Sequence, residues 1–79
     1  MDTATLQAFV EVARTGSFSI AAQHLFVTQS AISKRIAQLE SQLDTRLFDR
    51  IGRGINLTEA GRTLLPQAEG ILTQFEDAR

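Results

Sequence analysis

The chain lacks several features on which small protein domains often depend. It has no cysteine, so neither a disulfide framework nor a thiolate metal site is available. Its one histidine, His24, does not make a metal cluster alone, and we expect no metal and no cofactor. A run of about 18 apolar residues, as a membrane span needs, is missing, and so is a signal peptide. We therefore expect one small cytoplasmic domain of 79 residues with no membrane partner.

A general excess of basic side chains is also missing. The net charge is −1, whereas nucleic-acid-binding domains are usually basic. The charges are unevenly spread, however. Residues 28–54 carry five basic and three acidic side chains, whereas residues 55–79 carry two basic and four acidic ones. The middle third is therefore the positive part of the chain, by a small margin.

Apolar periodicity predicts two helices near the N-terminus. Apolar residues at i, i+3, i+4 and i+7 favour a helix over residues 3–14. Asp2 or Thr3 is suited to cap it, and Gly16 to end it. A second, shorter helix is predicted over residues 17–25, beginning on a serine of the kind that caps helices.

A third helix follows after a brief connection. Thr28 offers a hydroxyl cap, and the apolar spacing continues to near Leu43. Two helices separated by about three residues, the second starting at a cap residue, are typical of a helix-turn-helix. The phenylalanines of this region and its neighbours, Phe9, Phe18, Phe26 and Phe48, are expected in the core.

The remaining residues predict a hairpin and a long helix. Two short β-prone runs in residues 46–58 flank Gly52-Arg53-Gly54, which indicates a small hairpin with an arginine at its tip. Thr58 is suited to cap a last helix over residues 58–78, longer than a three-helix core of this size can cover. Pro66 lies inside this helix and is expected to bend it.

A helix, a helix-turn-helix and a two-stranded wing together predict a winged helix-turn-helix, a mainly α fold. In that fold the third helix enters the DNA major groove and must bring short polar groups to the base edges. Gln29 can pair with an adenine, and Ser30 and Ser33 are short enough to allow a close approach. Lys34 can reach a phosphate or a guanine. Arg53, between glycines, can enter the adjacent minor groove or contact the DNA backbone.

The chain resembles the DNA-binding domain of the LysR-type transcriptional regulators. The resemblance runs without a gap from Phe9 to Gly61 and rests on four ordered motifs: "GSFSIAAQHL", "TQSAISKRIAQLE", "RLFDR" and "LTEAG". It implies a dimeric winged helix-turn-helix over residues 1–57 and a long linker or dimerisation helix over residues 58–79. We predict that a homodimer or higher oligomer binds an inverted-repeat duplex operator. The predicted DNA-binding residues are Thr28, Gln29, Ser30, Ser33, Lys34, Arg50 and Arg53. The predicted dimer-interface residues are Leu64, Leu65, Ala68, Ile71, Leu72 and Phe75.

Two departures from the family pattern carry expectations of their own. The family usually has glycine where this chain has Asp44, which tolerates a left-handed turn better than most residues. The family also continues past the long helix into a ligand-sensing domain. We therefore expect that effector domain to be absent here, in a part taken from a longer regulator or in a stand-alone version.

Two other classes of function compete with DNA binding. An enzyme is disfavoured because no cysteine, no serine–histidine–acid constellation and no glycine-rich phosphate loop is present. A helical interaction or dimerisation module without DNA binding is the better alternative. It would require aromatic or aliphatic anchors on the outward face of the third helix, and that face has none in Gln29, Ser30, Ser33, Lys34, Ala37 and Ser41.

Overall fold

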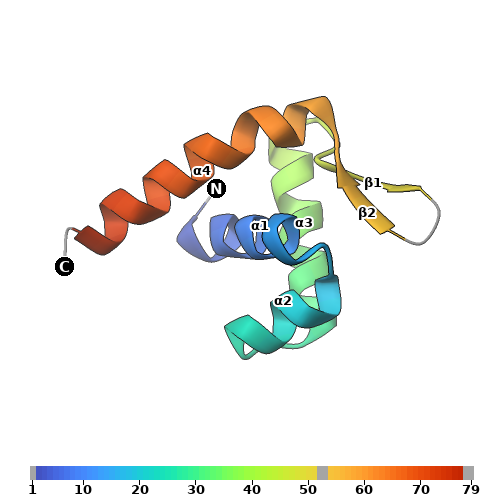
Figure 1. The fold of residues 1–79 in the computed structure, drawn as a ribbon, viewed down its shortest axis with the longest axis horizontal. Coiled ribbons are helices and arrows are strands. Elements are labelled where there is room, and N and C mark those ends of the chain that lie inside the picture. The colour runs from blue at the N-terminus through green and yellow to red at the C-terminus, as the bar shows by residue number, and fades with distance from the viewer. Residues whose placement is uncertain (1, 52–53, 78–79) are drawn as a thin grey trace.

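The computed structural model describes residues 2–51 and 54–77. In chain order the elements are α1 (Thr3–Thr15), α2 (Phe18–Leu25), α3 (Gln29–Leu43), β1 (Phe48–Ile51), β2 (Gly54–Leu57) and α4 (Glu59–Asp77). Figure 1 shows β1 and β2 as a hairpin that projects from the helical body, and α4 as the long helix that ends the chain. This is the predicted winged helix-turn-helix with a long C-terminal helix.

Side-chain caps define where the first three helices begin. The Asp2 carboxylate accepts hydrogen bonds from the Thr5 hydroxyl at 2.7 Å and the Thr5 N–H at 2.8 Å. These bonds hold the pKa of Asp2 below its ordinary value because they favour the ionised form. Ser17 and Thr28 cap α2 and α3 in the same way. Asp2 is thus the cap of α1, the first of the two predicted alternatives.

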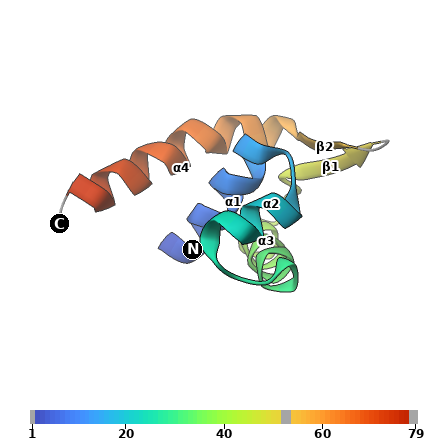
Figure 2. The same ribbon diagram turned by 60° about the horizontal axis from the view of Figure 1, so that its bottom comes forward.

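The core is built around α1, which lies between α2 and α4 in both views (Figures 1 and 2). The largest fully buried side chains are Phe9, Val12, Ile32, Leu39 and Leu47. Phe48 of β1 attaches the wing to this core. Its ring centroid lies 5.5 Å from that of Phe9 and 6.2 Å from that of Phe18, within the range of favourable aromatic contacts.

The prediction that Phe26 belongs to the core is wrong. Its side chain is 95% exposed. Phe26 is the residue at which α2 ends, and its backbone is left-handed, with φ 58° and ψ 41°. The chain reverses there toward α3, so Phe26 does not continue the apolar face of α2. Val27 instead packs against the core.

Asp44 ends α3 in the same left-handed conformation, with φ 52° and ψ 44°. Its N–H donates to the Ser41 carbonyl, and the next N–H, of Thr45, donates to the Glu40 carbonyl at 3.1 Å. These bonds satisfy carbonyls that a helix end would otherwise leave without partners. The expectation of a left-handed turn at Asp44 is therefore confirmed.

The junction between wing and α4 is closely packed. Thr58 donates its N–H to the Leu47 carbonyl at 3.0 Å, and its hydroxyl accepts from the N–H of Gly61 at 3.1 Å. A Cβ atom at Gly61 would overlap the Leu47 carbonyl oxygen and approach Leu57 Cδ2 to 2.8 Å. Glycine at position 61 thus lets the first turn of α4 lie directly against the chain segment that enters the wing.

The long helix α4 crosses α1 and then continues beyond it (Figure 2). Ala68 is fully buried, and Arg14 of α1 donates to the Glu69 carboxylate at 2.8 Å. The helix runs through Pro66 to Asp77. Its first half therefore shares the core of the domain, while the residues beyond Glu69 have less of the domain to cover them.

Candidate nucleic-acid interface

The outward face of α3 is polar and carries short side chains. The opposite face is fixed in the core by Ile32, Ile36 and Leu39, which are all buried. This anchoring determines the rotation of the helix. Gln29, Ser30 and Lys34 are consequently exposed, and Ser33 is half-buried at the edge of the same face.

The N-terminus of α3 is shaped by Thr28. Its Oγ1 accepts from the Ala31 N–H at 3.1 Å and lies 3.2 Å from Ser30 Oγ. Thr28 therefore acts as the structural cap of the helix and also brings the Ser30 hydroxyl beside its own. The N–H groups of a first helical turn create a positive end that suits a phosphate.

The wing carries the second predicted set of contacts. Arg50 belongs to β1 and is paired with Ile55 of the antiparallel strand β2. Arg53 lies outside the described residues. Contacts from these two arginines to DNA stay predictions.

A groove separates α3 from the segment that enters the wing. Its volume is about 370 Å³. It is lined by Phe18, Ser33, Ile36, Ala37, Glu40, Arg46 and Phe48. Sequence reasoning did not select Arg46 as a contact residue. Its position one residue before the apolar start of the wing was the available signal.

The predicted dimer-interface residues of α4 divide into three groups. Ala68 is fully buried within this single copy, so its side chain packs on its own domain, and its role at a dimer interface stays a prediction. Leu64, Leu65 and Leu72 are partly buried against the same core. Ile71 and Phe75 are 43% and 47% exposed.

Residues 2–51 and 54–77 carry neither a metal-binding cluster nor a membrane span. No group of three or more metal-ligating side chains lies together there. No helix in this part of the chain is long and apolar enough to cross a membrane.

The arrangement of helix-turn-helix, wing and long helix defines a winged helix-turn-helix domain. The model of the family described as "Bacterial regulatory helix-turn-helix protein, lysR family" matches residues 3–62. The chain belongs to this LysR family.

Relatives and solved structures agree with this assignment. An uncharacterized HTH-type transcriptional regulator of Azotobacter vinelandii is 62% identical over all 79 residues, and this chain spans 55% of its length. The HTH-type transcriptional regulator HdfR of Escherichia coli is 51% identical, and 28% of its length is covered. The chain thus spans about half or less of these relatives.

The similar structures include complexes with DNA. The crystal structure of the CbnR_DBD–DNA complex is 36% identical with a TM-score of 0.92, covering 99% of this chain and 90% of that one. The BenM_DBD/catB site 1 DNA complex is 29% identical with a TM-score of 0.94, covering 99% of this chain and 87% of that one.

Proposed function

We propose that this chain is the DNA-binding part of a LysR-type transcriptional regulator and binds a specific duplex site in the cytoplasm. Residues 1–57 form the DNA-binding domain, with α3 in the major groove and the wing at the adjacent minor groove. Residues 58–79 link and pair two copies. The observation that carries the proposal is the outward face of α3, which combines exposed Gln29, Ser30 and Lys34 with an anchored opposite face.

The alternative, a protein-interaction module without DNA binding, needs a large apolar anchor on that face. Along α3 the exposed large apolar side chain is Leu43, at the C-terminal end of the helix. The outward-facing side chains in the N-terminal half of α3 carry hydroxyl, amide and ammonium groups instead. These groups match base edges and phosphates better than they match an apolar protein surface.

Selection of bound sites from random duplexes tests the proposal, followed by titrations with variants. Gln29→Ala and Ser33→Ala are each expected to weaken discrimination at one position by about 1–3 kcal/mol. The affinity for DNA should also fall steeply as the salt concentration rises, because the basic side chains of the bound protein displace counterions from DNA. Gln7→Ala, an exposed glutamine of α1, is the matched control and should leave discrimination unchanged. Equal site preference in all four proteins contradicts the proposed role of α3.

We further propose that two copies pair through α4 and bind an inverted repeat, with half-sites about one helical turn or more apart. Ile71 and Phe75 are exposed on α4, next to the partly buried Leu64, Leu65 and Leu72. Apolar side chains of this size gain about 1.5–3 kcal/mol each on full burial. A second copy of the same helix would bury them.

Light scattering on Ile71→Glu and Phe75→Glu tests the pairing. Both variants are expected to be monomers at concentrations where the wild type is a dimer, because the new carboxylate would have to lose its hydration in the interface. Gln74→Glu adds the same charge to an exposed residue of the same turn and should stay dimeric. A dimer in all three variants would rule out this surface.

A further inference from the structure

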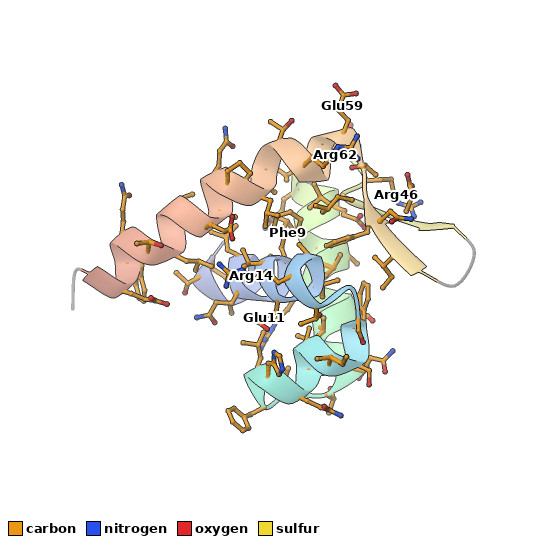
Figure 3. The ribbon with its side chains drawn as sticks, viewed as in Figure 1. Phe9, Glu11, Arg14, Arg46, Glu59 and Arg62 are labelled. Carbon is orange, nitrogen blue, oxygen red and sulfur yellow. The ribbon has the colours of Figure 1, made fainter. Side chains whose placement is uncertain are left out.

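The guanidinium of Arg46 lies at the edge of the groove between α3 and the wing. None of the contacts proposed so far involves this cation. The Arg46 side chain is 73% exposed. It comes directly before Leu47 and Phe48, which are 1% and 5% exposed and hold this segment in the core. The backbone at Arg46 is therefore fixed, and its hydroxyl neighbour Thr58 donates to the Arg46 carbonyl at 2.6 Å. Figure 3 shows Arg46 beside the wing, whereas Arg14 lies over α1.

The contacts of the Arg46 guanidinium within the domain are long. Its Nη2 donates to the Phe48 carbonyl at 3.5 Å, and its Nε lies 3.9 Å from the Glu40 carboxylate. A guanidinium has five N–H donors, so these two weak contacts leave most of its donor capacity for another ligand. A phosphate accepts hydrogen bonds from such a group in a planar, paired arrangement.

Glu40 is the acidic group that faces the same groove, and its charge has to be considered. Its Oε2 accepts a hydrogen bond from the Leu47 N–H at 2.8 Å, and its side chain is only 21% exposed. The carboxylate is thus engaged mainly with the backbone N–H of Leu47 and only weakly with the Arg46 guanidinium. A ligand that approaches the groove from solvent therefore reaches the more exposed Arg46 guanidinium before the Glu40 carboxylate.

We infer that Arg46 contacts a DNA phosphate and that one strand of the duplex lies along the groove between α3 and the wing. The inference rests on the proposed function, because it assumes that α3 enters the major groove. With α3 there and the wing at the minor groove, the strand that separates the two grooves must pass between them. The small side chains of Ser33 and Ala37 line the α3 side of that passage, and Arg46 lies on the wing side.

The salt dependence of binding tests this role, since each phosphate contact adds about 0.9 to the slope of log K against log salt. Arg46→Gln is expected to lower the slope by about that amount and to weaken selected and mismatched sites equally, by about tenfold at low salt. Arg46→Lys should keep the slope, because an ammonium still displaces a counterion. Arg14→Gln is the matched control. Its guanidinium is 58% exposed and also pairs with a carboxylate, Glu69, but lies between α1 and α4.

The outcomes separate the inference from the proposed function. A lower slope for Arg46→Gln alone supports the phosphate contact, and thermal unfolding of each variant checks that the fold is kept. A slope equal to that of the wild type overturns the inference, and so does an equal change in Arg14→Gln. A wild type that binds no duplex overturns the proposed function, and this inference with it.

Discussion

The two long helices, α3 and α4, use their surfaces in opposite ways. α3 buries aliphatic side chains on one face and presents short or polar ones on most of the other. α4 buries Ala68 completely yet leaves Ile71 and Phe75 43% and 47% exposed. One helix is thus anchored by large side chains and polar outside, while the other approaches the core through a small residue and keeps large apolar groups outside.

This difference shows how each helix can serve a different partner. A polyanion is recognised by hydroxyl, amide and cationic groups on a helix that its own core holds in a fixed rotation. A second protein copy is recognised by apolar area that the single copy leaves uncovered. Under the proposed function, the same short chain separates a surface for DNA from a surface for pairing, on two helices that are joined through the wing.

Truncation of one isoleucine in each helix is the strongest way to break the comparison. Ile32→Ala removes a fully buried side chain of α3, and the cavity should lower the free energy of unfolding by about 2–5 kcal/mol at every protein concentration. Ile71→Ala should lower it only where the wild type is dimeric, because dimerisation stabilises the folded state by mass action. Denaturant unfolding at several protein concentrations measures both. A concentration-independent loss in Ile71→Ala would place this side chain in the core of one copy.

Substitutions at two glycines of α4 are expected to have the next largest effects on stability. Gly61→Ala forces a Cβ against the Leu47 carbonyl oxygen, so we expect a loss of about 2 kcal/mol from overpacking at the wing junction. Gly70 has nothing within 4 Å of an added Cβ, so Gly70→Ala should gain up to about 1 kcal/mol from helix propensity. Opposite shifts in the thermal midpoint are the expected result. Similar shifts in both variants would mean that the junction has room for a methyl group at position 61.

Local signals in the sequence were sufficient for most of the fold. The caps at Asp2, Ser17 and Thr28, and the helix ends at Gly16 and Asp44, depend on the residue itself and its near neighbours. The apolar periodicity of α3 likewise fixed which face is buried, and therefore which polar groups point outward. These features can be predicted from the sequence because the interactions that stabilise them lie within about one helical turn.

The remaining features depend on contacts that periodicity does not describe. Ala68 lies on the apolar stripe of α4, but only the close crossing over α1 decides that a small residue is buried while Ile71 stays exposed. Arg46 lines a groove formed by α2, α3 and β1 together, so the sequence pattern of any one element could not predict its place in that groove. The alternation of apolar residues also could not reveal that the chain reverses at Phe26.

Phe26 gives the smallest effect, and it tests whether the entry to α3 is set by backbone conformation alone. The left-handed region costs an L-residue roughly 1–2 kcal/mol, and asparagine tolerates it better than most. Because the ring is 95% exposed, Phe26→Asn loses almost no burial and should gain up to about 1 kcal/mol. For a domain of this size that gain corresponds to a rise of about 4–8 °C in the thermal midpoint. Phe26→Leu keeps the strained backbone, so it should show no gain. A fall in the midpoint for Phe26→Asn would mean that the ring stabilises the connection between α2 and α3.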